Sequence, residues 1–207
     1  MILLNGPNTP FGRMALATAL ELGIAVENRV INVFDCEALD AINPLRQIPT
    51  LLFDDGRMLC DSRVICGYFC SLRPGRALNP VDDRWEVHTR WWLALGLMEA
   101  SVGRVMEGLR PQVQQSEAFL SKCDRRVRNV VAQFEAHSGE ICRPDARIDR
   151  LAVAVVLEYI DFRLGRDWRT NAPNLARWLE TETLRPSLAG SRPRDRLPTD
   201  PVTLDLS

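Results

Sequence analysis

Hydrophobic and polar positions in the first part of the chain alternate between short strand-like runs and longer helical ones. Residues 2–4 form a short apolar run of the kind found in buried strands. A helix is expected next, with Thr9 as its N-cap and Pro10 in its first turn. Gly23 is expected to end that helix, and residues 28–33 favour a second strand.

A hairpin and a third helix complete this pattern. Residues 51–53 and 58–60 are strand-like and flank residues 54–57, where Asp-Gly suits a tight turn. A helix is then expected over residues 62–72. The order strand–helix–strand, strand–strand–helix is typical of a small α/β sheet domain.

The pattern changes after residue 73, where prolines and glycines interrupt it. We therefore divide the chain into a domain over 1–73, a linker over 74–81 and a second domain over 82–207. Only helices are expected in the second domain, over residues 82–108, 114–137, 148–165 and 174–184. The helix over 148–165 is apolar on almost every side, which predicts a central core helix. The tail from Pro186 contains four prolines and is expected to be extended over the surface.

Composition excludes several classes of protein. The 207 residues contain 26 basic and 27 acidic side chains, so a sequence-independent nucleic-acid binder is not expected. The six cysteines and two histidines show no metal-ligand spacing, and no metal is predicted. The longest apolar run, residues 151–157, is too short to cross a membrane. Unpaired cysteines and an N-terminal segment without signal-peptide features predict a cytoplasmic protein.

The most informative stretch is residues 43–51, Asn-Pro-Leu-Arg-Gln-Ile-Pro-Thr-Leu, which is followed by Asp61 and Ser62 at the start of a helix. Here the chain resembles a glutathione transferase. The resemblance covers nearly the whole chain, because Tyr-Ile-Asp-Phe-Arg at 159–163 and Arg-Pro-Ser at 185–187 also fit it. It implies a fold with a thioredoxin-like α/β domain followed by an all-α helical bundle.

The resemblance also implies a glutathione site. Pro49 is expected to be cis, so that the backbone of Ile48 pairs with the cysteinyl part of glutathione; the alternative is a plain turn proline. Ser62, at a helix N-terminus, is expected to hold the γ-glutamyl carboxylate, and Asp61 the γ-glutamyl ammonium. The alternative is that Asp61 and Ser62 only cap the helix, and we expect both roles to hold. Gln47 matches a position that contacts the glutathione backbone or its glycine carboxylate.

The resemblance further implies a group that stabilises the glutathione thiolate near the first strand–helix junction. Family members use Tyr, Ser or Cys there, but the first residues of these types in this chain come later: Tyr68, Ser62 and Cys36. Thr9 takes the place of the usual serine, and Phe11, two residues on, is assigned to the glutathione site. Two alternatives stay open: Thr9 only caps the helix, or Asn8 is the donor.

Two features of the second domain complete the expectations. At least one of Trp91, Met98 and Val102 is expected to face the hydrophobic-substrate cleft, because their helix lines that cleft in this family. The alternative is that these residues belong to the core, as such residues at helical spacing more often do. Relatives begin the core helix with a Ser/Thr-x-x-Asp capping box, whereas this chain has Arg147 and Arg150 there. Two alternatives stay open: Asp145 or Asp149 caps this helix instead, or the start of the helix is less stable.

The leading function is therefore a transferase that takes glutathione as co-substrate and presents its thiolate to a hydrophobic electrophile. One alternative is glutathione-dependent reduction of disulfides or peroxides, and another is a non-catalytic binding protein with the same fold. The resemblance also implies a homodimer, with Arg63, Tyr68 and the 82–108 helix as candidate contacts. Neither a nucleic-acid nor a membrane partner is expected.

Overall fold

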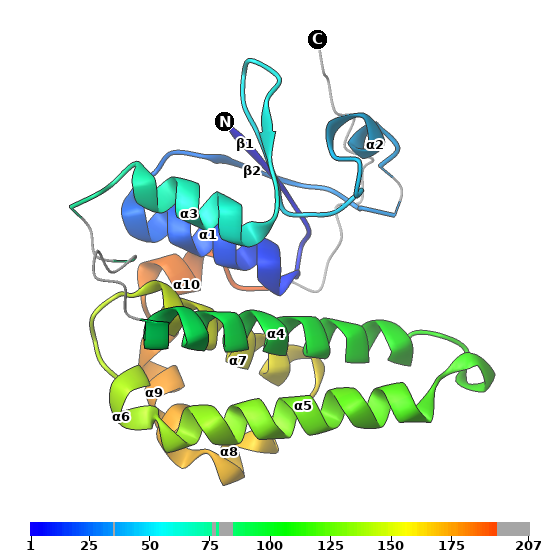
Figure 1. Ribbon diagram of the computed structural model, residues 1–207, viewed down its shortest axis with the longest axis vertical. Helices are drawn as coiled ribbons and strands as arrows, with labels where there is room; N and C mark the ends of the chain where they lie inside the picture. The colour runs from blue at the N-terminus through cyan, green and yellow to red at the C-terminus, as the bar shows by residue number, and fades with distance from the viewer. Residues whose placement is uncertain (35, 76–77, 79–84, 194–207) are drawn as a thin grey trace. The chain divides into compact units, whose positions relative to one another are not determined.

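The computed structural model describes residues 1–34, 36–75, 78 and 85–193 (Figure 1). Chain contacts divide it into two compact units. The first holds the described residues before 79 together with those from Pro186 on, and the second holds residues 85–185. Most of the predicted linker, residues 76–77 and 79–81, lies outside the described part of the chain.

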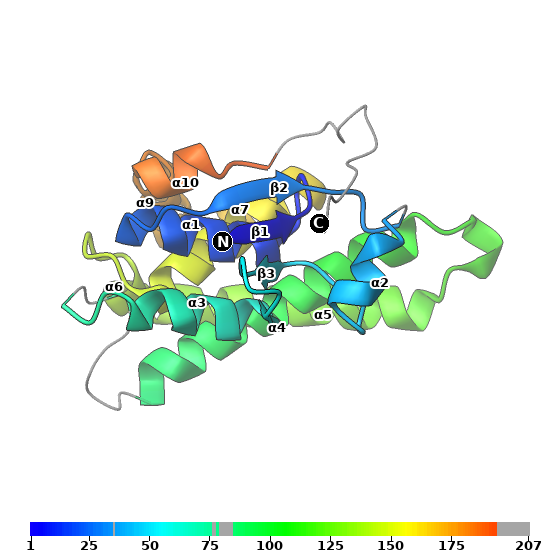
Figure 2. The same ribbon diagram turned by 90° about the horizontal axis from the view of Figure 1, so that it is seen from above.

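The first unit is built on a four-stranded sheet with the order β2-β1-β3-β4. Its strands are β1 (Ile2–Asn5), β2 (Glu27–Val30), β3 (Thr50–Leu52) and β4 (Met58–Leu59). Strand β1 pairs in parallel with β2 and antiparallel with β3, and the β3–β4 pair is the predicted hairpin (Figure 2). These strands confirm the predicted α/β domain.

Three helices accompany this sheet. Helices α1 (Pro10–Leu22) and α3 (Ser62–Ser71) lie side by side (Figures 1 and 2). Gly23 ends α1 in the left-handed conformation, with φ of 64°, as predicted. The short helix α2 (Ala38–Ile42) was not expected; its Leu39 is fully buried in a core cluster that includes Leu4.

The prediction of an extended tail is wrong at its beginning. Residues Pro186–Gly190 form helix α10, and Leu188 is fully buried. Arg13 donates from Nη2 to the carbonyl of Leu188 at 3.2 Å, and Ser187 donates to Glu21 at 2.6 Å. Pro186 does not prevent this helix, because proline is tolerated in the first turn. The helical conformation of these residues is instead stabilised by the burial of Leu188 and by the two hydrogen bonds to α1. Residues 194–207 of the tail lie outside the described part.

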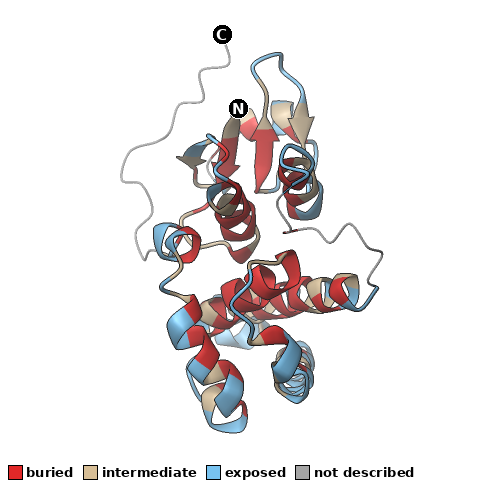
Figure 3. Ribbon diagram, turned by 90° about the vertical axis from the view of Figure 1, so that its left-hand side faces the viewer, coloured by how far each residue is buried: buried red, intermediate tan, exposed pale blue. Residues whose placement is uncertain are grey.

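The regular secondary structure in the described residues of the second unit is all helical, and the four predicted helices are confirmed. They are α4 (Trp85–Gly108), α5 (Glu117–Ala136), α7 (Ile148–Arg163) and α9 (Pro173–Glu182). Short segments η1 (Gln112–Gln114), α6 (Ser138–Ile141) and α8 (Trp168–Asn171) connect them. All residues of α7 from Ile148 to Leu157 are buried, which makes α7 the expected core helix. Figure 3 shows buried residues in red and the exposed outer turns in pale blue.

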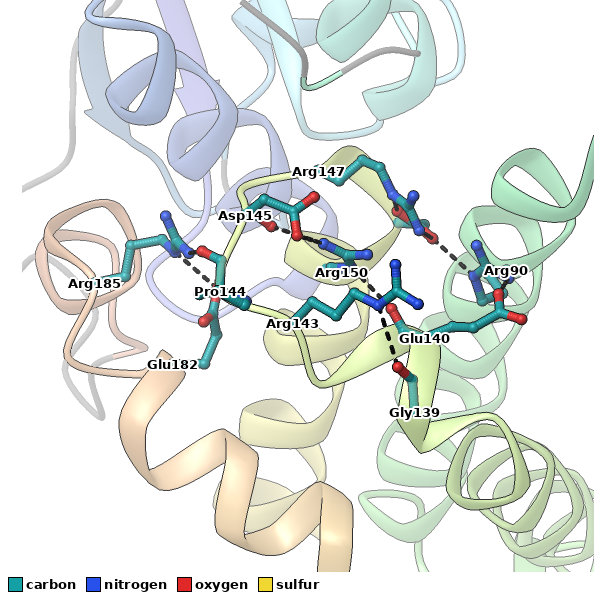
Figure 4. Close-up of polar contacts among 11 residues, drawn as sticks. Arg90, Gly139, Glu140, Arg143, Pro144, Asp145, Arg147, Arg150, Glu182 and Arg185 are labelled. Carbon is teal, nitrogen blue, oxygen red and sulfur yellow. Dashed lines mark hydrogen bonds and ion pairs between the residues drawn. The ribbon is translucent and has the colours of Figure 1, made fainter. Parts of the chain in front are cut away.

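Ion pairs replace the missing capping box at the start of α7 (Figure 4). Arg147 is the N-cap residue, and the helix start has no side-chain cap hydrogen bond, so neither Asp145 nor Asp149 caps it. Instead the buried carboxylate of Asp149 accepts hydrogen bonds from Nε of Arg147 and Nε of Arg90, each at 2.8 Å. The buried Arg150 pairs with Asp145. Buried charges that are paired in this way avoid the large cost of an isolated buried ion.

Candidate functional site

The first part of the site is the junction between β1 and α1. Thr9 is the N-cap residue of α1, with extended backbone angles, and its carbonyl accepts a hydrogen bond from the N–H of Arg13 at 3.0 Å. Its side chain makes no capping hydrogen bond. Within the described residues, the half-buried Thr9 hydroxyl has no hydrogen-bond partner at all. This hydroxyl therefore stands at a helix N-terminus, available to a ligand.

Gly6 brings Thr9 together with the loop that precedes β3. A Cβ atom on Gly6 would lie 2.8 Å from Cδ1 of Ile48 and 3.4 Å from Cγ2 of Thr9. The side chains of Ile48 and Thr9 therefore converge on the space that a larger residue would fill. Two residues predicted for the same site, far apart in the sequence, are thus neighbours in the fold.

The loop before β3 is fixed by a buried amide. The peptide bond between Ile48 and Pro49 is cis, as predicted. Asn43, fully buried, donates from Nδ2 to the carbonyl of Gln47 at 3.0 Å and to Oγ1 of Thr50 at 2.9 Å. Thr50 donates to the same Gln47 carbonyl at 2.8 Å. These bonds hold the Gln47 backbone, while the Gln47 side chain is exposed and Ile48 is half-buried.

The third part of the site is the start of α3. Asp61 is the N-cap residue, and its Oδ1 accepts a hydrogen bond from the N–H of Arg63 at 2.9 Å. Its Oδ2 lies 3.4 Å from Nη2 of Arg63, and just over half of the side chain is exposed. Ser62 is the first helical residue and is 3% exposed; its hydroxyl has no hydrogen-bond partner among the described residues. A helix N-terminus with a free hydroxyl and an accessible carboxylate can hold a group that carries both charges.

Comparisons with known proteins identify this arrangement. A family model described as the N-terminal domain of glutathione S-transferases matches residues 3–77. The crystal structure of a glutathione S-transferase from Methylobacillus flagellatus KT with GSH bound is 30% identical. The alignment covers 93% of this chain and 99% of that one, with a TM-score of 0.87. The chain belongs to the glutathione S-transferase family.

Two further relatives support the assignment. A glutathione transferase family member from Pseudomonas fluorescens Pf-5, solved with bound glutathione, is 33% identical, and the alignment covers 93% of this chain and 98% of that one. Its TM-score is 0.84. The uncharacterised GST-like protein YibF of Escherichia coli K12 is 28% identical over 93% of this chain and 98% of its own length. The fold of this glutathione S-transferase family member is therefore the expected one.

The remaining predicted site residues of this family member are divided between its units. Phe11 is half-buried in the first turn of α1. Thr9 and the six residues assigned to glutathione binding all lie in the first unit. Trp91, Met98 and Val102 all belong to α4 in the second unit. Met98 is fully buried, whereas Trp91 and Val102 are half-buried.

Helix α3 also carries two buried cysteines, Cys66 and Cys70. Burial raises the pKa of the Cys66 thiol to about 12 and that of Cys70 to about 11, so both are protonated at neutral pH and serve packing. Thr18 donates a hydrogen bond to Sγ of Cys66 at 3.4 Å. In the described ranges, no group of His, Cys, Asp or Glu side chains could hold a metal ion. None of the described helices is long and apolar enough to cross a membrane.

Sequence reasoning missed Asn5 and Gly12, which shape the β1–α1 junction. Asn5, at the end of β1, is 4% exposed, and its Oδ1 accepts a hydrogen bond from the N–H of Gly6 at 2.8 Å. A Cβ atom on Gly12 would lie 1.6 Å from this same Oδ1. The sequence did carry a signal for this arrangement: the polar Asn5 ends an apolar strand, and Gly6 and Gly12 flank Thr9.

Proposed function

We propose that this glutathione S-transferase family member is a transferase that activates the glutathione thiol for attack on a hydrophobic electrophile. One observation carries the proposal: Thr9, whose methyl group faces Ile48 across Gly6 at the start of α1, has a hydroxyl with no hydrogen-bond partner in the described chain. A hydroxyl at a helix N-terminus is the arrangement that a thiolate needs, because both the donor and the helix dipole favour negative charge.

Both ends of glutathione, and its cysteinyl part, would be bound by residues of the first unit. The N-terminus of α3 and the Ser62 hydroxyl would hold the γ-glutamyl carboxylate, and Oδ2 of Asp61 would meet the γ-glutamyl ammonium. The backbone of Ile48, before cis-Pro49, would pair with the cysteinyl part. Gln47, whose side chain is exposed, would contact the glycyl end. Glutathione as the ligand is supported by the two relatives described above, which were solved with glutathione bound.

The chemical step would use the hydroxyl as a donor rather than as a base. The thiol proton leaves to solvent, and the thiolate accepts the Thr9 O–H hydrogen bond. The sulfur then forms a bond to the electrophilic carbon, and the leaving group departs with its electron pair. The Pf-5 relative was also solved with bound S-(propanoic acid)-glutathione, a glutathione bearing a carbon substituent on sulfur.

Helix α4 carries the residues that we assign to the electrophile. We propose Trp91, Met98 and Val102 as contacts for an apolar substrate. Trp91 and Val102 have accessible surface, whereas Met98 is fully buried and would act indirectly, through the packing of α4. Their apolar character defines the substrate class only as hydrophobic.

Two assays test the activity. Turnover of a chlorodinitrobenzene-type electrophile with glutathione should exceed turnover of a hydroxyethyl-disulfide-type substrate. Faster reduction of the disulfide would instead make the protein a glutathione-dependent reductase. Failure to bind immobilised glutathione would leave only a non-catalytic binding role.

A homodimer is expected in solution, with Arg63, Tyr68 and α4 at its interface. Sedimentation or light scattering should give a mass near twice the chain mass of 23.4 kDa at micromolar concentration. A mass of a single chain would contradict this assignment. We also assign the protein to the cytoplasm, where its six free thiols would stay reduced.

A further inference from the structure

The carboxamide of Asn5 is a buried polar group whose two ends are both used. Its Oδ1 accepts the N–H of Gly6 at 2.8 Å, and its Nδ2 donates to Oδ1 of Asn28 on β2 at 3.1 Å. Asn5 itself is anchored in the sheet, because its carbonyl accepts the N–H of Ile31 at 2.8 Å. The side chain therefore projects from a rigid strand and ties down the first residue of the β1–α1 loop.

The same carboxamide lies against the first turn of α1. A Cβ atom on Gly12 would be 1.6 Å from Oδ1 of Asn5, 2.5 Å from its Cγ and 2.9 Å from Cγ2 of Thr9. The Asn5 side chain and the Thr9 methyl group thus both border the space above Gly12. Gly6, whose N–H donates to Asn5, also borders the Thr9 methyl group, because a Cβ atom on Gly6 would lie 3.4 Å from Cγ2 of Thr9.

We propose that Asn5 is a positioning residue for Thr9. The loop from Gly6 to Thr9 begins at the N–H that Asn5 holds and ends at the helix turn that Asn5 contacts. The carboxamide therefore sets both the start and the end of the segment that carries the hydroxyl. This inference rests on the proposed function, because it assigns Asn5 an effect on glutathione only through the Thr9 hydroxyl.

Removing the carboxamide should raise the pKa of the bound glutathione thiol. In Asn5→Ala the Gly6 N–H loses its acceptor and a space opens beside Gly12, so the loop can shift and lengthen the hydrogen bond from Thr9. Small displacements of a positioned group are costly, and we expect conjugation at neutral pH to slow by roughly three- to tenfold. The effect on glutathione affinity should be much smaller, since Asp61, Ser62 and the Ile48 backbone are not held by Asn5.

Asn28→Ala is the matched control. It removes the partner of Nδ2 from an exposed position on β2 and leaves the bond from Gly6 to Oδ1 in place. We expect it to leave the thiol pKa unchanged. If Asn5→Ala proves too unstable by thermal melting, Asn5→Ser removes most of the carboxamide with a smaller loss of volume and should shift the pKa in the same direction.

A double-mutant cycle with Thr9 decides between a positioning role and a general structural one. The readout is the thiolate absorbance of the glutathione complex against pH. Asn5→Ala should raise the thiol pKa in the wild-type background and have no further effect in Thr9→Ala. An equal shift in both backgrounds, or no shift in folded Asn5→Ala while Thr9→Ala does shift, would overturn the inference alone. No shift in Thr9→Ala would instead overturn the proposed role of Thr9.

Discussion

Replacing Thr9 by Ala should raise the pKa of the bound glutathione thiol by about one to two units, because the lost hydrogen bond to the thiolate is worth about 1.5–3 kcal/mol. A free thiol with a pKa of about 8.5 is only a few per cent ionised at neutral pH, so catalysis needs a shift of about two units, or roughly 2.7 kcal/mol. The N-terminus of α1 supplies about 0.3–1 kcal/mol of this. The hydroxyl is therefore the larger contribution.

The sign of the pH dependence follows from this shift. A higher thiol pKa lowers the thiolate fraction at neutral pH, so conjugation by Thr9→Ala should be roughly ten- to a hundredfold slower near pH 7. The rate should recover as the pH rises through the new pKa. Titration of the thiolate absorbance in the glutathione complex measures the shift directly.

The structure makes this experiment cleaner than the sequence suggested. Thr9 occupies the N-cap position, but its hydroxyl makes no capping hydrogen bond, so Thr9→Ala should cost little stability. Thermal melting checks this point, and Thr9→Ser, which keeps the hydroxyl, should retain most activity. If the titration were unchanged in a folded Thr9→Ala protein, the group that stabilises the thiolate would be Asn8 or a backbone N–H instead of Thr9.

Ser62→Ala and Asp61→Ala should each weaken glutathione binding by roughly ten- to a hundredfold, because each removes a charge-assisted hydrogen bond worth about 1.5–3 kcal/mol. Their effects on stability should differ. Asp61 caps α3 through the N–H of Arg63, and losing a cap costs about 1 kcal/mol. Ser62 makes no such bond within the described chain, so its removal should leave the melting temperature almost unchanged.

Asp55→Ala provides a control with the same local chemistry. Asp55 accepts the N–H of Arg57 at 3.1 Å and pairs with Nε of Arg57 at 2.7 Å. Asp61 likewise accepts the N–H of Arg63 and pairs with its side chain, through Nη2, but Asp55 lies in the β3–β4 turn. Hydrogen bonds from Arg57 lower the pKa of Asp55, so it is a carboxylate at neutral pH. Calorimetry should show wild-type glutathione affinity in Asp55→Ala. Wild-type affinity in both site variants would mean that the pocket is misplaced.

Local chemistry made the ends of the main elements predictable from the sequence. Gly23 ends α1 with φ of 64°, and Gly56, in the predicted Asp-Gly turn, has φ of 84°. Both conformations suit glycine because it has no Cβ, so the residue type itself marks the position. The long helices of the second unit were predictable for a similar reason, since many residues repeat one pattern.

Short elements gave no such signal. Helices α2, α6, α8 and α10 have four or five residues each, too few for a helical period to be visible. Their conformations depend on contacts with distant residues, such as the burial of Leu188 and its bond to Arg13. The start of α7 shows the same limit, because the buried Asp149 is paired with Arg90, which lies far away in the sequence.

The site divides along the same line. The sequence by itself determined which residues we propose for the site, because Asp61-Ser62, Ile48-Pro49 and Thr9 stand at recognisable positions beside strand and helix ends. Only the tertiary structure decided that the Thr9 hydroxyl is not used as a cap, that Ile48 and Thr9 meet at Gly6, and that Asn5 occupies the space beside Gly12. Hydrogen bonds and close contacts depend on distances between separate segments, and those distances exist only once the chain has folded.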